Sequence, residues 1–386
     1  MSRRLCGSST LSADTSTAPI AYVDLGRQAA DEREMLHRAL DEVIDSGFFV
    51  GGGLIEELEA KLAAFCGVKE AVVLASGTDA LELGMRALGI GPGDEVITPP
   101  NSFVASTGAI VAIGSTPVFV DVQHDQNIDP ALIEAAITKR TKAIMPVHLS
   151  GRIADMNPIV EIARRHGLKV IEDAAQAIGS RYDGRPAGSF GDIGCFSTHP
   201  LKNLNACGDG GFLTTDDQAV AETVRRLRNH GLADRNTVEE FATVARMDTF
   251  QAAILLRRLE TLDRVSEARR NNAALYRTLL DPALVYAPPC RDIEYNTFHT
   301  FVVQVDDRDG LQAHLKSLGI GSAIHYPIPI HLQPAARGLG FGPGDFPVTE
   351  EQAGRILTLP VHQYLTEAEI RRVADAVNVY LSRKAA

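Results

Sequence analysis

Short apolar runs alternate with helical patterns from Gly67 to about Thr215, and this alternation limits the fold more than any other feature of the sequence. It is typical of parallel βαβ units. The runs are rich in valine and isoleucine and only weakly alternating, as expected of strands buried on both faces. Helical stretches at 79–88 and 157–166 are each followed by glycine, a common stop signal. The expected strands span residues 71–74, 95–98, 117–121, 143–147, 169–172, 194–197 and 211–214.

The pattern changes near Gln218, and from there to Asp281 the sequence is mostly helical, with long amphipathic stretches at 247–262 and 264–280. Beyond it the pattern predicts a strand at 297–305, a helix at 309–318, a strand near 320–325 and a helix at 367–381. We therefore expect three parts. Residues 1–19 form a disordered tail, 20–262 a large α/β domain with a mostly parallel sheet and helices on both faces, and 263–386 a smaller α+β domain.

Composition excludes several classes of function. A formal charge of -11 over 386 residues argues against a nucleic-acid-binding protein, because phosphate binding depends on clustered cations. Five cysteines without a C-x-x-C pair suggest neither a disulfide framework nor a zinc site, so we expect no metal. The first 19 residues lack the apolar stretch of a signal peptide, and no run approaches the roughly 18 apolar residues of a membrane span. These features predict a cytoplasmic protein that does not bind membranes.

Ser76-Gly77-Thr78 joins a predicted buried strand to a predicted helix. Free N–H groups and the helix dipole make such a helix start an anion site, and Gly77 permits close approach of the anion. A hydroxyl from Ser76 or Thr78 adds a potential hydrogen bond. Taken alone, however, the segment is better explained as an ordinary helix cap.

Two further signals follow later strands. Asp173 ends a buried strand, where ligands of open α/β sheets bind, and Gln176 lies one helical turn further on. An N-cap or an ion pair explains the acid equally well. Lys202 lies in a polar loop between two core strands, and a partly desolvated lysine there has a lowered pKa and becomes a nucleophile. An anion site, a strand-end acid and this lysine together suit pyridoxal 5'-phosphate (PLP).

At this point the chain resembles the DegT/DnrJ/EryC1/StrS family of sugar aminotransferases, a fold-type-I PLP group, from about Tyr22 to Leu381. The resemblance rests on segments 46–52, 76–81, 101–105, 172–176, 197–211, 246–248, 251–253, 325–327 and 359–360. It implies a PLP-dependent aminotransferase with pyridoxamine 5'-phosphate (PMP) as the intermediate cofactor form. The implied reaction moves an amino group from L-glutamate to a keto-sugar nucleotide, for antibiotic, glycan or surface polysaccharide biosynthesis.

The resemblance also implies residue roles. Lys202 is the Schiff-base lysine, Asp173 keeps the pyridine nitrogen protonated, and Gln176 bonds the phenolic oxygen. Three residues hold the phosphate, Phe103 stacks on the cofactor, and two residues approach the sugar nucleotide. The phosphate residues are Gly77, Thr78 and Ser197, and the sugar residues are His325 and Tyr326. Plain core packing explains Phe103 as well, and a structural turn explains the His-Tyr-Pro segment.

One position departs from the family. Members commonly carry an asparagine that reaches the cofactor phosphate of the partner subunit, and here that position is Val244, which cannot donate a hydrogen bond. Either Asn229, His230 or Arg246 replaces the contact, or one subunit alone holds the phosphate. A homodimer is still the expected state for this fold type.

Three other functions stay open at this stage. The chain is alternatively a keto-cyclitol aminotransferase of aminoglycoside biosynthesis, a PLP- or PMP-dependent sugar dehydratase, or a non-catalytic PLP-binding regulator. Lys202 argues against the dehydratase, whose family branch carries histidine at that position. Intact Lys202, Asp173 and Gln176 argue against the regulator, and no basic stripe for DNA is present. The sequence separates the cyclitol and sugar acceptors poorly.

Overall fold

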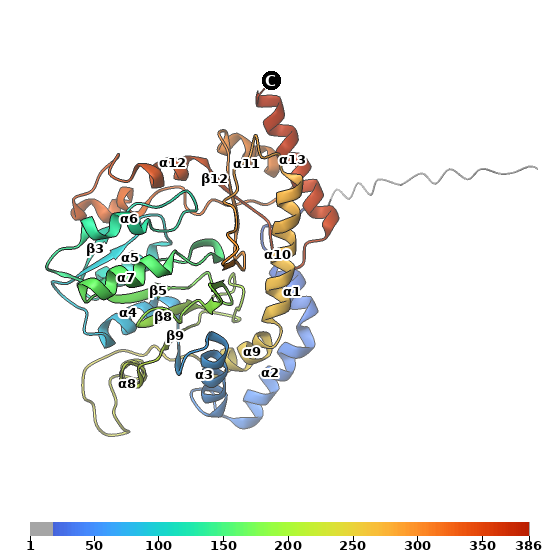
Figure 1. Ribbon diagram of the computed structural model, residues 1–386. Helices are drawn as coiled ribbons and strands as arrows, with labels where there is room; N and C mark the ends of the chain where they lie inside the picture. Colours follow the sequence, from blue (N-terminus) through green and yellow to red (C-terminus); the bar gives the residue numbers. More distant parts are fainter. Residues whose placement is uncertain (1–17, 386) are drawn as a thin grey trace, which may run out of the picture.

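A seven-stranded sheet forms the centre of the large part of the molecule in the computed structural model, which describes residues 18–385 (Figure 1). Its strands are β1 (Glu70–Leu74), β2 (Glu95–Thr98), β3 (Thr116–Phe119), β4 (Thr141–Ile144), β5 (Lys169–Asp173), β8 (Ile193–Ser197) and β9 (Gly211–Thr215). Their order is β1-β9-β8-β5-β4-β2-β3. Only β9 runs antiparallel to its neighbours. The predicted mostly parallel sheet is confirmed, and each of the seven predicted strands overlaps one of these.

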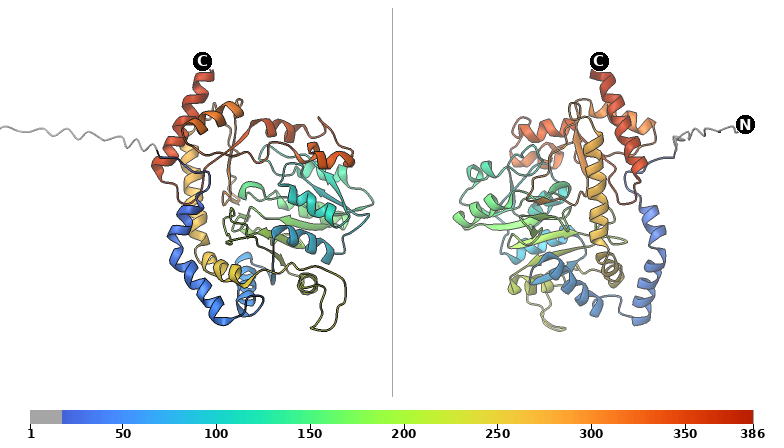
Figure 2. Two further views of the ribbon diagram at one scale, coloured as in Figure 1. Left: turned by 180° about the vertical axis from the view of Figure 1, so that it is seen from behind. Right: turned by 45° about the vertical axis from the view of Figure 1, so that its right-hand side comes forward.

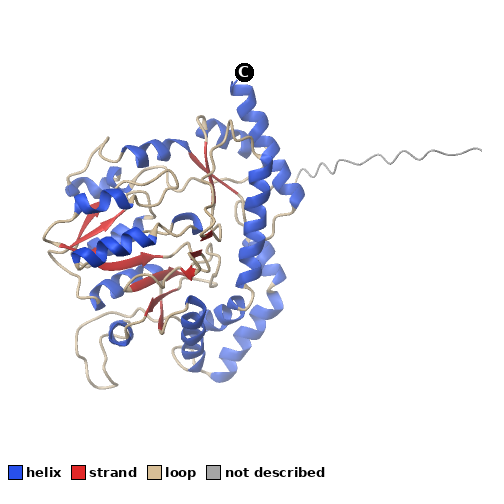
Figure 3. Cartoon of the chain, viewed as in Figure 1, coloured by secondary structure: helices blue, strands red, loops and turns tan. Residues whose placement is uncertain are grey.

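Helices cover both faces of the sheet, as Figure 3 shows. On one face lie α4 (Gly77–Ala87), α5 (Val104–Ala112) and α8 (Gln218–Leu227), which share an apolar cluster with the sheet. On the other lie α3 (Gly53–Cys66), α7 (Met156–His166) and α9 (Thr249–Leu259), with a second cluster. Strands buried between two such layers have no polar face, which explains their continuous apolar runs.

Local signals explain where these helices begin and end. The predicted helix at 79–88 begins two residues earlier, at Gly77, because the Ser76 hydroxyl caps it by accepting a 3.0 Å hydrogen bond from the Asp79 N–H. At the C-terminal end of α7, Gly167 adopts the left-handed conformation, with φ of 65°. A residue without a Cβ takes that conformation without strain, so the glycine ends the helix.

The C-terminal part is built around a two-stranded antiparallel sheet. Its elements are α10 (Leu262–Leu279), β11 (Phe301–Gln304), α11 (Arg308–Ser317), α12 (Pro347–Arg355), β12 (Ile356–Leu359) and α13 (Glu367–Ala385). Helices α10 and α13 lie side by side (Figure 2). Ile20 packs in the same apolar cluster as Tyr276 and Phe301, so the first described residues join the C-terminal part. The domain boundary at 262/263 stays a prediction.

The remaining elements are short or peripheral. Helices α1 (Leu25–Asp31) and α2 (Arg33–Ser46) run along the outside of the molecule, and α6 (Pro130–Ile133) follows β3. Strands β6 (Arg181–Tyr182), β7 (Arg185–Pro186) and β10 (Glu294–Tyr295) form a small sheet. Four 3₁₀ turns span Glu134–Ala136, Leu149–Gly151, Ile330–Leu332 and Pro334–Leu339.

One sequence-based expectation is wrong. The segment 320–325 is not a strand, because Ile320 pairs with Ile20 whereas Ala323 pairs with Thr358, so no continuous ladder forms. The stretch 218–281 is mostly helical as expected, through α8, α9 and α10, although residues 228–248 within it are held by isolated pairs and a turn at Asp234. Residues 1–17 of the expected tail lie outside the described part of the chain. Within residues 18–385, no helix has the length and apolar character needed to cross a membrane.

Candidate active site

A cavity of about 320 Å³ lies at the edge of the sheet where the parallel strands end. This is the edge at which ligands of open α/β sheets bind. All nine residues predicted as site residues line it: Gly77, Thr78, Phe103, Asp173, Gln176, Ser197, Lys202, His325 and Tyr326. The structure therefore brings together residues from both parts of the chain, while the role of each stays a prediction.

Strand register places the Ser76 turn against the end of β8. Leu74 and Ser197 both pair with Gly211, so the start of α4 and the end of β8 lie level with each other. A Cβ atom on Gly77 would lie 2.8 Å from the Ser197 Cβ, closer than real Cβ atoms approach. Only glycine fits between them, and it leaves the helix N-terminus open to an anion.

Asp173 ends β5 and is buried at the cavity wall. Its Oδ2 accepts a 2.6 Å hydrogen bond from the Ser106 hydroxyl, and its Oδ1 accepts one of 3.2 Å from the Ala175 N–H. Both oxygens are therefore held in place. Ser106 is a site residue that the sequence analysis missed, and its one signal is a polar side chain on the buried face of an apolar helix.

Gln176 is fixed at both ends of its amide. The Oε1 atom accepts a 2.8 Å hydrogen bond from the Ser150 N–H, and Nε2 donates one of 3.3 Å to the Tyr326 hydroxyl. Burial raises the pKa of Tyr326, and the charge of Asp173 raises it further. The Tyr326 ring lies 5.8 Å from the Phe103 ring, and Phe103 is 55% exposed. An aromatic face is thus available to a flat ligand at the mouth of the cavity.

Lys202 lies in the loop between β8 and β9, where its N–H donates to the His199 carbonyl at 2.8 Å. Among the described residues, no acidic side chain forms an ion pair with its ammonium group. Burial lowers the pKa of Lys202 to about 8, although the charge of Asp173 opposes this shift. Near neutral pH an appreciable fraction of this amine is therefore uncharged and nucleophilic.

Three histidines also line the cavity. His325, predicted from the sequence, shares a 2.9 Å hydrogen bond between Nδ1 and the Thr358 hydroxyl, and burial lowers its pKa to about 4. His199 and His299 were not identified from the sequence. A lone histidine carries no spacing signal, so nothing in the sequence distinguished these two from surface histidines.

A second buried pair supports the end of β5. Glu172 accepts hydrogen bonds from three backbone N–H groups and lies 2.9 Å from Nε2 of His148. The Ala154 N–H donates to Nδ1 of His148, so the hydrogen of this neutral ring lies on Nε2 and points at Glu172. The His148 N–H in turn donates to the Asp173 carbonyl. This arrangement fixes the backbone that carries Asp173.

The residues present fit PLP. The open N-terminus of α4 suits a phosphate, and the carboxylate of Asp173 suits a ring nitrogen that carries a proton. The amide of Gln176 suits a phenolic oxygen, and the uncharged amine of Lys202 suits an aldehyde. A cavity of about 320 Å³ is within the range of small-molecule sites.

Comparisons with known proteins agree with this fit. The family model "DegT/DnrJ/EryC1/StrS aminotransferase family" matches residues 30–378. The chain is 42% identical to a pleiotropic regulatory protein of Geobacillus stearothermophilus, over 93% of this chain and 97% of that protein. It is 41% identical to dTDP-3-amino-3,4,6-trideoxy-alpha-D-glucose transaminase of Streptomyces venezuelae, over 97% and 99%. It is also 42% identical to UDP-N-acetyl-3-dehydro-alpha-D-glucosamine 3-aminotransferase of Acidithiobacillus ferrooxidans, over 94% and 98%.

Solved structures share the whole fold. DesV from S. venezuelae has a TM-score of 0.92 at 41% identity, covering 95% of this chain and 99% of that one. NtdA from Bacillus subtilis, solved with bound PMP, has a TM-score of 0.85 at 34% identity, covering 91% of this chain and 82% of that one. The predicted fold class and cofactor are therefore confirmed.

Proposed function

Because the chain belongs to the DegT/DnrJ/EryC1/StrS aminotransferase family, we propose that it transfers an amino group from L-glutamate to a keto-sugar nucleotide. The protein is a PLP-dependent aminotransferase. One observation carries the finer proposal: Lys202, Asp173 and Gln176 converge on one cavity in a chain whose relatives are named as sugar-nucleotide transaminases. The product is an amino-deoxy sugar.

The predicted cofactor-binding residues have the following roles in the proposed reaction. Lys202 Nζ holds the aldehyde carbon of the cofactor, Asp173 keeps a proton on the ring nitrogen, and Gln176 donates to the phenolic oxygen. The phosphate lies at the start of α4 beside Gly77, Thr78 and Ser197, and Phe103 covers a face of the ring. When bound, PLP supplies an electron-accepting ring that makes the carbon-bound proton of the donor acidic.

Lys202 then moves that proton. With cofactor and amino donor bound, the uncharged Nζ of Lys202 would accept the proton of the donor α-carbon and would deliver it to the aldehyde carbon of the cofactor. The lowered pKa suits this exchange, because a base with a pKa near 8 both accepts and releases a proton close to neutral pH.

The acceptor is inferred from the relatives. The two named transaminases act on dTDP-linked and UDP-linked sugars, so the nucleotide of the substrate is open between these. His325 and Tyr326 are proposed to contact the sugar nucleotide. Lys202 argues against a dehydratase, and the regulatory alternative is supported only by the names of two relatives, one called a regulatory protein and one a sensory transduction protein. A keto-cyclitol acceptor remains the alternative that the experiment below distinguishes.

We also propose a homodimer, because several large apolar side chains are exposed, and two of them, Phe103 and Leu201, line the cavity. The exposed ones are Phe48, Phe49, Val50, Phe103, Val104 and Leu201. Val244 is exposed, and Arg246 Nη1 donates to Asn229 Oδ1 at 3.1 Å. Asn229 and Arg246 are thus paired with each other, and Arg246 is the candidate for a contact across the interface. Analytical ultracentrifugation tests the dimer, and a monomer would contradict it. The cytoplasmic location stays a prediction.

A half-reaction screen tests the function. Holoenzyme is treated with glutamate, the loss of the aldehyde absorption band is followed, and keto-sugar nucleotides or keto-cyclitols are then added. Return of the band with a keto-sugar nucleotide supports the proposal, return with a keto-cyclitol alone supports the alternative, and no loss with any donor refutes both. Borohydride reduction should leave a pyridoxyl group on the peptide with Lys202 in the Lys139→Ala control but on no peptide in Lys202→Ala.

A further inference from the structure

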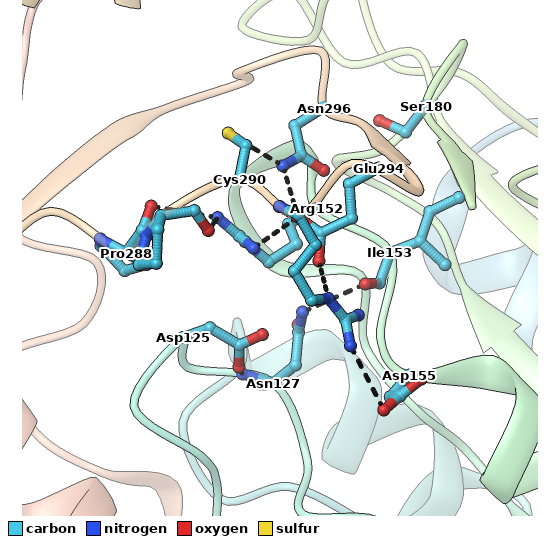
Figure 4. Close-up of polar contacts among 12 residues, drawn as sticks. Asp125, Asn127, Arg152, Ile153, Asp155, Ser180, Pro288, Cys290, Glu294 and Asn296 are labelled. Carbon is cyan, nitrogen blue, oxygen red and sulfur yellow. Dashed lines mark hydrogen bonds and ion pairs between the residues drawn. The ribbon is translucent and has the colours of Figure 1, made fainter. Parts of the chain in front are cut away.

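A tightly held turn at residues 296–300 carries His299 to the cavity wall. The segment before it is fixed by the polar network in Figure 4. There the Glu294 carboxylate accepts hydrogen bonds from Arg152 Nη1 at 2.6 Å and from Asn296 Nδ2 at 3.0 Å. Arg152 Nη2 donates to the carbonyls of Pro288 and Pro289. The buried network therefore anchors the chain up to Asn296, three residues before His299.

The turn itself is held from two further sides. Arg269, on α10, donates through Nη1 to the carbonyls of Phe298 at 3.3 Å and of His299 at 3.1 Å. A Cβ atom on Gly151 would lie 2.8 Å from the backbone nitrogens of both Phe298 and His299, so that loop packs directly against the turn. Phe298 has a φ of 46°, a conformation that non-glycine residues rarely adopt. The surroundings thus force one orientation on His299.

The imidazole that this turn presents has no partner. Nδ1 of His299 is buried, and neither ring nitrogen forms a hydrogen bond to any residue within the part of the chain that the structure describes. Burial holds the pKa of His299 well below its usual range, as do the neighbouring groups of Lys202, Arg269, His325 and His199. The ring is therefore neutral, with one N–H to donate and no acceptor for it among residues 18–385.

Arg269 behind the turn is equally unusual. It is 5% exposed, it has no ion pair with any acidic group among residues 18–385, and its Nε has no hydrogen-bond partner. A buried charge without a counter-charge is costly. Asp173, the buried acid on this cavity, already has both oxygens engaged. Arg269 and Lys202 both line a small neighbouring cavity, whose lining also includes Asp24.

We propose that His299, backed by the charge of Arg269, binds the carboxylate of the amino donor. The inference rests on the proposed function, because the α-carbon whose proton Lys202 removes carries that carboxylate one bond away. A carboxylate is the group that accepts from a neutral N–H and also compensates a buried cation. His299 contacts the donor, and Arg269 is a positioning residue that holds the turn and supplies the field.

The experiment measures binding without turnover. Glutarate, a dicarboxylate without an amino group, is titrated into the PLP-loaded holoenzyme, and the cofactor absorbance reports occupancy. The variant His299→Phe removes the N–H group that donates the hydrogen bond, whereas His299→Gln keeps an amide N–H. The exposed His124→Gln is the matched control. We expect His299→Phe to weaken glutarate binding by about tenfold or more, since it removes a hydrogen bond to a charged group, and His299→Gln to weaken it less.

The two half-reactions separate this inference from the function itself. In His299→Phe the apparent Kd for glutamate should rise in the first half-reaction, whereas the keto-sugar should react with the PMP form as in the control. Unchanged glutarate binding overturns the inference and leaves the aminotransferase proposal intact. A defect confined to a carboxylate-bearing keto-sugar also overturns it, because the site would then serve the acceptor. Failure of all donors to bleach wild-type cofactor refutes the function instead. If His299→Phe does not retain cofactor, the Kd of His299→Gln for glutarate decides the question. In that case a wild-type Kd for glutarate in Arg269→Met also counts against the inference.

Discussion

The Ser106 hydroxyl donates a 2.6 Å hydrogen bond to Oδ2 of Asp173, and both side chains are buried. The bond joins α5 to the end of β5. It also means that the carboxylate proposed to face the cofactor ring is oriented before any cofactor arrives, because its other oxygen is held by the Ala175 N–H. A preorganised carboxylate loses little freedom when it binds a cationic ring.

We expect Ser106→Ala to lower the free energy of unfolding of the apoenzyme by about 1–3 kcal/mol, because it leaves a buried carboxylate oxygen without a donor. Urea denaturation measures this. Thr107→Val is the matched control on the same helix, since its buried hydroxyl has no partner in the described part of the chain. A double-mutant cycle with Asp173→Asn should show a coupling free energy of similar size. Equal effects of Ser106→Ala and Thr107→Val would contradict the prediction.

The reactivity of Lys202 should change with pH near 8. Burial lowers its pKa to about 8, so the fraction of uncharged amine should rise roughly tenfold per pH unit below that value and level off above it. For an ordinary exposed lysine the same rise continues to about pH 10.4 before it levels off. The measurement is the rate at which an amine-selective reagent modifies the Lys202 peptide of the apoenzyme, read by mass spectrometry.

The substitution Asp173→Asn tests how the charge of Asp173 affects the pKa of Lys202. The negative charge of Asp173 stabilises the ammonium form and so raises the pKa of Lys202 against the effect of burial. Removing the charge should therefore move the midpoint of the labelling profile to lower pH. A midpoint that moves upward would contradict this effect of Asp173, and a wild-type midpoint already near 10 would show that the lysine is not desolvated.

The glycine at the start of α4 should not tolerate a methyl group. In Gly77→Ala the new Cβ lies 2.8 Å from the Ser197 Cβ, so the turn must separate from the end of β8. We expect a loss of about 1–3 kcal/mol in the free energy of unfolding and weaker PLP binding, measured by equilibrium titration. Gly354→Ala, in an exposed helical position with open space around it, should be neutral or stabilising. Normal cofactor affinity in Gly77→Ala would refute the proposed phosphate site.

How much the sequence predicted depends on the range of the interactions. Asp173 and Lys202 were predictable because each follows a buried strand, and parallel strands end at one edge of the sheet. The segment 320–325 was misassigned, since an extended apolar pattern does not show whether one partner strand runs along all of it. Pairing partners are a tertiary property that local patterns do not contain.

Ser106 and His299 were missed for a related reason. A serine in an apolar helix is a weak signal until the buried carboxylate opposite it is known. His299 depends on a turn held by Arg269 and packed on Gly151, both distant in sequence. The family resemblance identified residues within the segments that are similar to the family, but it gave no reason to examine a lone histidine outside them.

The last prediction concerns Glu172, because both of its carboxylate oxygens accept hydrogen bonds and neither can be replaced by an NH₂ group. Oε1 accepts from the N–H groups of Phe190 and Gly191, and Oε2 accepts from the Gly188 N–H and from His148. In Glu172→Gln either orientation of the amide places an NH₂ group against a backbone donor. A tautomer switch in His148 would not relieve this, since the Ala154 N–H needs Nδ1 as acceptor. We expect a loss of about 3 kcal/mol or more in urea denaturation and reduced PLP retention, whereas the exposed Glu351→Gln should stay within about 1 kcal/mol of the wild type. A wild-type denaturation midpoint in Glu172→Gln would show that this carboxylate does not support the backbone of Asp173.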